Sequence, residues 1–105
     1  MPYFFCRLTS PRPSFAADMT AEEQTLMAEH GAYWIPRLES GDAIVFGFVA
    51  DPAGGWGTCI VDVPDESTAR ELAAGDPVIR RGEGFHYDVF AMPNAIAAVV
   101  SSGES

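Results

Sequence analysis

A helix with clear start and stop signals, followed at once by an apolar strand, is the feature that most constrains the fold of this sequence. Thr20 and Glu23 form a capping box, in which each side chain accepts a hydrogen bond from the other residue's backbone amide. Apolar positions, with one histidine among them, then recur every three or four residues: Leu26, Met27, His30, Trp34 and Leu38. Gly41 supplies the left-handed residue that ends the helix.

Four segments have the branched and aromatic composition of β-strands, and they cover residues 3–8, 43–50, 57–63 and 85–92. A second helix is predicted from Asp65, which caps it, to Gly75, which ends it. The order strand, helix, strand, strand, helix, strand predicts a ferredoxin-like α+β fold. In this fold a four-stranded antiparallel sheet carries two helices on one face.

Turn-forming residues separate these elements. Pro11 and Pro13 lack the amide donors that a strand needs, so residues 9–18 are predicted to form a loop. The segment from Asp51 to Gly55 predicts the turn of a hairpin between the second and third strands. Asp76 followed by Pro77 predicts a cap and first-turn proline, which begin one more short helical turn before Gly82.

The strands are apolar on both of their faces, while two helices can cover only one face of the sheet. A monomer would expose an apolar patch larger than soluble monomers usually carry. Pairing of two copies, sheet against sheet about a two-fold axis, covers the second face with a single self-complementary surface. The sequence therefore predicts a homodimer joined through its sheet face.

Length and composition limit the organisation of the chain. Its 105 residues form one domain, predicted over residues 1–93, followed by a C-terminal extension with a frayed tail at 94–105. A net charge of −9 disfavours binding to nucleic acid and to anionic membrane surfaces. Cys6 and Cys59 lie in separate apolar runs and are interpreted as buried, reduced thiols. Together with a start that lacks a signal peptide or membrane span, this predicts a cytoplasmic protein.

The pattern from the first strand to Pro93 resembles the YciI-like (YCII-related) family of the dimeric α+β barrel superfamily. The resemblance includes His30 with Gly41 eleven positions later, and the strand that ends FGFVAD at Asp51. It continues through the Asp76-Pro77 pair to Gly82. The resemblance implies a ferredoxin-like dimer joined through its sheets and a catalytic His and Asp pair that falls on His30 and Asp51. It also implies similarity to muconolactone isomerases and to dehydrochlorinases of ring-cleavage products.

The candidate catalytic residues are thus His30 and Asp51, and each also has a structural interpretation. A histidine on an apolar helix face is often a satisfied core residue. An aspartate before a proline often caps the amides of its own turn. If paired, Asp51 would accept a hydrogen bond from one ring nitrogen of His30, leaving the other nitrogen to take or give a proton.

Four further residues are candidates for substrate binding. Trp34, Phe48 and Trp56 could form an aromatic wall for a planar ligand, although aromatic residues at such spacings are also typical of a core. Arg7 could bind a substrate carboxylate, or form a salt bridge at the end of its strand. The two histidines, His30 and His86, have no HxH or HxxxH spacing, and no metal site is predicted.

These observations support two hypotheses of function. The first is a small enzyme of the lyase or isomerase type that needs no cofactor. It would use a His-Asp pair to transfer protons on a small metabolite, either acidic or derived from a ring. The second is a non-catalytic dimeric module that binds a small ligand or another protein.

Overall fold

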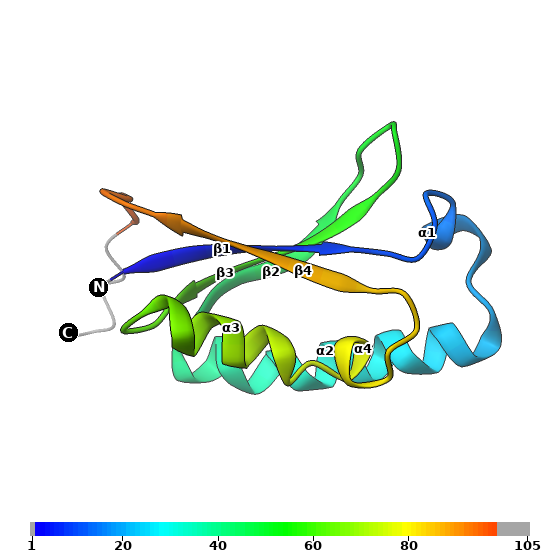
Figure 1. Cartoon of the computed structure of the whole chain (residues 1–105), viewed down its shortest axis with the longest axis horizontal. Coiled ribbons are helices and arrows are strands. Elements are labelled where there is room, and N and C mark those ends of the chain that lie inside the picture. Colours follow the sequence, from blue (N-terminus) through cyan, green and yellow to red (C-terminus); the bar gives the residue numbers. More distant parts are fainter. Residues whose placement is uncertain (1, 99–105) are drawn as a thin grey trace.

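The computed structural model describes residues 2–98 and confirms the predicted α+β fold. Its strands pair entirely antiparallel, in the order β2-β3-β1-β4. In Figure 1, helices α2, α3 and α4 all lie on the same side of the sheet. The elements run, in chain order, β1 Tyr3–Thr9, α1 Phe15–Asp18, α2 Ala21–Ser40, β2 Ala43–Val49, β3 Trp56–Asp62, α3 Glu66–Ala74, α4 Pro77–Arg80 and β4 His86–Met92.

Helix α2 begins and ends where the sequence predicts. The Thr20 hydroxyl accepts from the Glu23 amide at 3.1 Å, and the Glu23 carboxylate accepts from the Thr20 amide at 2.9 Å. Gly41 has φ +88° and donates its amide to the carbonyl of Leu38. Leu26, His30 and Trp34 are the buried residues of the helix, so its inward face is the one that the spacing indicates.

The core lies between the helices and the inward face of the sheet. Cys6 and Cys59 face each other on adjacent strands there, and both are buried and free of disulfides. Burial raises the pKa of the Cys6 thiol to about 11 and also raises the pKa of Cys59. Both thiols therefore stay protonated at neutral pH, as the prediction of reduced core cysteines requires.

The second crossover, from β3 to β4, contains two short helices. Asp65 caps α3 by accepting from the Thr68 amide at 2.8 Å. Asp76 caps α4 by accepting from the Val78 amide at 3.1 Å, and Pro77 occupies the first turn. The predicted cap and first-turn proline are thus confirmed, and the Asp76 side chain at this cap has no solvent exposure.

One segment predicted as a loop contains a short helix. The segment between β1 and α2 is not entirely a loop, because it contains α1, whose Phe15 is buried against Phe85 with ring centroids 5.2 Å apart. The final part of the predicted C-terminal extension, residues 99–105, lies outside the described residues. Among residues 2–98, none of the helices combines the length and hydropathy needed to cross a bilayer.

The two glycines of α2 and its cap give a matched test of the helix. Gly41→Ala should lower the free energy of unfolding by about 1 kcal/mol, because φ +88° is unfavourable for any residue with a Cβ. Gly31→Ala should raise it by about 0.5–1 kcal/mol, because Gly31 lies inside the helix and its Cβ would meet nothing within 4 Å. Urea unfolding measures both. Equal effects of the two substitutions would contradict the assignment of Gly41 as a left-handed cap.

Candidate active site

His30 projects from the buried face of α2 and forms a hydrogen bond with a residue that is distant in sequence. Its Nδ1 lies 2.7 Å from Oδ2 of Asp76, and the histidine side chain is only 9% exposed. Asp76 reaches this position because it begins α4, which packs beside α2. The histidine predicted as an acid/base group is therefore held by a carboxylate, as the hypothesis requires, but the carboxylate is Asp76.

Asp76 is surrounded by hydrogen-bond donors. Its Oδ2 accepts from Trp34 Nε1 at 2.8 Å and from the Tyr87 hydroxyl at 2.6 Å, in addition to His30. Its Oδ1 accepts from the Val78 amide at 3.1 Å. Burial raises the pKa of the Asp76 carboxyl, but the bonds from His30, Tyr87 and Trp34 outweigh burial and hold the pKa below its usual value. Asp76 is therefore ionised at neutral pH.

An ionised Asp76 determines how His30 carries its proton. A carboxylate can only accept, so Nδ1 of His30 must be the protonated nitrogen. Within the described part of the chain no protein group hydrogen-bonds to Nε2, and His30 also lines a cavity. The ring consequently has one nitrogen fixed in the protein interior and one that can exchange a proton with a bound molecule.

The predicted contact between His30 and Asp51 is not formed. Asp51 lies in the β2–β3 turn, where its Oδ1 accepts from the Ala53 amide at 2.9 Å and its Oδ2 accepts from Trp56 Nε1 at 3.1 Å. These bonds lower the pKa of the half-buried Asp51 carboxyl. The physical reason for the difference is the direction of the hairpin, whose turn projects away from the helices (Figure 1). The turn-aspartate interpretation of Asp51 is the one that the structure supports.

A cavity of about 260 Å³ adjoins His30 at the end of the sheet nearest the β2–β3 turn. Its walls come from β1, α1, the start of α2, the hairpin and the residue before β4. The Phe46 ring lies 5.0 Å from the imidazole, centroid to centroid. His30 is the ionisable residue among those that line it: Leu8, Ser10, Phe15, Ala16, Met19, Met27, His30, Phe46, Gly47, Phe48, Gly55, Trp56, Gly57 and Phe85.

The predicted substrate-binding residues divide into two groups. Phe48 and Trp56 line the cavity, as proposed for an aromatic wall. Trp34 is fully buried and bonds to Asp76, so it lies behind His30 and does not line the cavity. Arg7 does not line it either, because its guanidinium lies 4.5 Å from the centre of the Trp56 ring, at the border of an adjoining groove.

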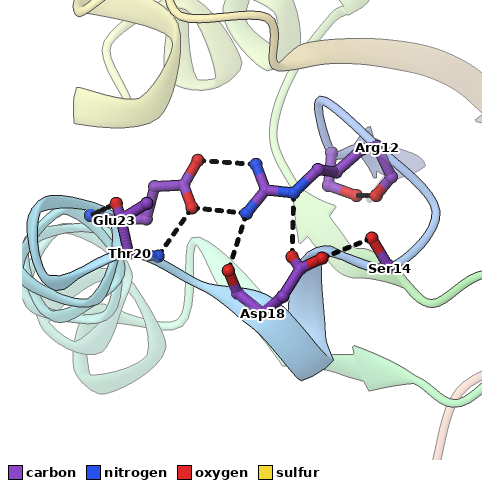
Figure 2. Close-up of polar contacts among 6 residues, drawn as sticks. Arg12, Ser14, Asp18, Thr20 and Glu23 are labelled. Atoms are coloured by element: carbon purple, nitrogen blue, oxygen red, sulfur yellow. Dashed lines mark hydrogen bonds and ion pairs between the residues drawn. The ribbon is translucent and has the colours of Figure 1, made fainter.

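One wall of the cavity is fixed by a charged clamp, which Figure 2 shows. Arg12 donates through Nε to Asp18 at 2.8 Å and through its terminal nitrogens to Glu23 at 2.7 and 2.9 Å. The bond from Arg12 lowers the pKa of Glu23 to about 2. Ser14 also donates to Asp18, at 2.7 Å. Because the clamp joins α1 to the first turn of α2, it holds Phe15 against the cavity.

Sequence reasoning missed several residues of this site. The sequence explained Asp76 as a helix cap. A cap uses only one carboxylate oxygen, and the partner of the other oxygen was not predicted. Tyr87 looked like one more aromatic residue of a strand, and Phe15 fell in a predicted loop. No local pattern distinguishes Asp76 from the other acidic residues, because its place before Pro77 is fully explained by a helix cap. Within residues 2–98, no three His, Cys, Asp or Glu side chains cluster as metal ligands.

The importance of the Asp76 carboxylate can be tested by stability. Asp76→Asn should lower the free energy of unfolding by about 3 kcal/mol at pH 7, because an amide at this position leaves a donor facing a donor. Asp51→Asn, in an exposed turn, should lower it by about 1 kcal/mol or less. Urea unfolding of both variants at several pH values makes the comparison.

The pH dependence provides the control for this prediction. The folded-state pKa of Asp76 is depressed, so its stabilising contribution is fully present above the ordinary value of 3.8 and is lost as pH falls through the depressed value. The difference between Asp76→Asn and the parent should therefore shrink at the acid end. A difference that stays constant from pH 7 to acid would contradict a role for the negative charge.

Comparison with known proteins agrees with this architecture. Residues 3–93 match the family model of the YCII-related domain, and the match includes all four strands, His30 and Asp76. None of the curated proteins compared with the sequence matches it. Because the family match spans nearly the whole described chain, from the first strand to the residue after the last, the chain belongs to the YCII-related domain family.

Proposed function

We propose that this protein is a small enzyme of the lyase or isomerase type, in which His30 transfers a proton on a small ring-bearing metabolite without a cofactor. The observation that carries the proposal is the asymmetric setting of His30. Its Nδ1 is bonded to the buried carboxylate of Asp76 at 2.7 Å, and its ring borders an apolar cavity. A carboxylate behind an imidazole fixes the tautomer and stabilises the imidazolium that forms when the ring accepts a proton.

The chemistry follows from this arrangement. Nε2 takes a proton from a carbon next to a carbonyl group, and the electrons of the broken C–H bond form a double bond while the carbonyl oxygen gains the charge. In an isomerisation, the imidazolium returns the proton to a different carbon. In an elimination, the electrons instead expel a leaving group from the adjacent carbon, and the proton passes from His30 to water. In both cases Asp76 stays ionised.

The cavity favours a particular kind of ligand. Its walls are aromatic, aliphatic and thioether side chains, together with glycines and the single hydroxyl of Ser10. Its volume of about 260 Å³ exceeds the ~150 Å³ of an apolar protein cavity that accommodates benzene. A substituted ring of modest size therefore suits it. A carboxylate on such a ring would fit better in the adjoining groove, which Arg7 borders and which shares Ser10, Gly55 and Trp56 with the cavity.

Asp51 and Trp34 take supporting roles in this proposal. Asp51 accepts from the indole of Trp56 and so fixes that ring at the edge of the cavity. Trp34 contacts Asp76 from behind the histidine. Phe48 is 60% exposed and lies against Gly55, where a Cβ would collide with its ring. Phe48 therefore borders the mouth of the cavity, where a ligand enters.

Proton abstraction can be tested before the natural substrate is identified. The probe is cyclohex-3-en-1-one, a small apolar ring whose isomerisation to the conjugated ketone is base-catalysed and visible by ultraviolet absorbance. We expect the parent protein to accelerate both the isomerisation and the exchange of the acidic hydrogens in D₂O. His30→Gln should reduce the acceleration by roughly 100-fold or more.

His86→Gln is the matched control, because His86 is exposed on β4 and does not line the cavity. It should leave the rate unchanged. A folded His30→Gln protein as active as the parent would overturn the proposal. Saturable binding of the probe with no exchange would instead favour the alternative function, a module that binds a small ligand without altering it.

We also propose that two copies associate through the sheet face that the helices leave open. Phe5 on this face stacks with Phe90, with ring centroids 6.0 Å apart, and contacts Trp56 edge-on. Phe90 is 51% exposed and Val45 is 45% exposed. Side chains of this size on one open sheet form the kind of patch that a second copy covers.

Two exposed apolar residues provide the test of association. The parent protein should sediment with the mass of two chains at micromolar concentration, and Phe90→Glu should sediment with the mass of one. The substitution places a charge in the surface that the dimer would bury. Ile35→Glu is matched to it, since Ile35 is also 51% exposed but lies on α2, in the opposite layer. It should leave the mass unchanged. A parent protein that sediments as a single chain would contradict the proposal.

A further inference from the structure

One oxygen of Asp76 receives three side-chain donors from two different elements. His30 and Trp34 approach Oδ2 from successive turns of α2, at 2.7 and 2.8 Å. Tyr87 approaches the same oxygen from β4, at 2.6 Å. Acid/base transfer at His30 needs only the first of these contacts. The other two contacts form, with Asp76, a buried cluster behind the histidine.

The direction of each hydrogen bond in this cluster is fixed. The indole N–H of Trp34 can only donate. It also lies 3.2 Å from the Tyr87 oxygen, which therefore accepts from Trp34 and gives its own proton to Asp76. The second carboxylate oxygen faces the Val78 amide. A proton on Oδ1 would face the Val78 N–H, and a proton on Oδ2 would face the donors of His30 and Tyr87. Protonation of Asp76 is therefore unfavourable in this cluster.

From this geometry we infer that Trp34 and Tyr87 are positioning residues for the proposed reaction. Together they hold Asp76 as a carboxylate with Oδ2 directed at Nδ1, and so keep Nε2 of His30 as the free proton acceptor. Their role in catalysis rests on the proposed function. Their hydrogen bonds to Asp76 are present in the folded protein whether or not it catalyses that reaction. Neither residue lines the cavity, so they act through Asp76 and His30.

The cluster also determines how strongly Asp76 attracts the proton on His30. A carboxylate oxygen shared by three donors gives part of its charge to each of them. Removing the Tyr87 hydroxyl leaves that charge to the two remaining donors, so the bond to His30 should become stronger. A histidine bound more strongly as an imidazolium releases its proton more reluctantly. Tyr87 therefore moderates the hydrogen bond between Asp76 and His30.

The test compares Tyr87→Phe with Tyr33→Phe. Tyr33 donates to the carbonyl of Leu72 at 2.7 Å, so its hydroxyl makes a bond of similar length that is not part of the cluster. In Tyr87→Phe, the ¹³C signal of the Asp76 carboxyl should titrate at a higher pH than in the parent, since one donor to the carboxylate is lost. The proton on Nδ1 of His30 should move downfield, and exchange of cyclohex-3-en-1-one should slow several-fold.

Tyr33→Phe should leave all three measurements at the parent values. Trp34→Phe repeats the test on the second donor, because it also removes a hydrogen bond to Oδ2 of Asp76, and Tyr33→Phe is the control for both variants. If Tyr87→Phe leaves the Asp76 titration and the His30 proton unchanged, the inference is wrong. If these two signals move while no variant, including the parent, exchanges the probe, the positioning network stands and the proposed function fails.

Discussion

The buried carboxylate of Asp76 is the group on which the rest of this structure depends. Transferring a carboxylate from water into a protein costs several kcal/mol, unless donors replace the lost hydration. Here four donors do so, from Trp34, Tyr87, His30 and the Val78 amide. They belong to α2, α4 and β4, so satisfying this one charge fixes the positions of both crossover connections relative to the sheet.

Asp76 and its donors form a polar cluster in the interior, and an apolar cavity lies next to this cluster. His30 stands at the boundary, with Nδ1 in the cluster and its ring at the cavity wall. On the cavity side the histidine meets aromatic rings, which exclude water and strengthen electrostatic interactions within the site. The clamp of Arg12 on Asp18 and Glu23 keeps α1 in place as part of that wall (Figure 2).

The two faces of the sheet have different roles. Its inward face carries the core and leads to the site, while its outward face retains large apolar side chains such as Phe90. The hairpin turn of Asp51 lies near neither the cluster nor the helices, and its contribution is to hold Trp56. Trp56 borders both the cavity and the open sheet face, where it contacts Phe5. His30 and Phe90 each belong to only one of these surfaces, so substitutions at these two residues examine ligand binding and association of copies separately.

The sequence by itself determined the order of the four strands and of α2, α3 and α4, the limits of α2 and the cap at Asp76, because capping boxes, glycine stops and apolar periodicity act over a few residues. It did not predict α1. It also indicated His30 as the candidate proton carrier, from its place on an apolar helix face and from a family resemblance. The pairing with Asp76 was decided by the tertiary structure, because it joins residues 46 positions apart. Local patterns carry no information on which of several carboxylates a fold will bury. Only the packing of α4 beside α2 brings Asp76 to His30, and only the outward course of the hairpin takes Asp51 away.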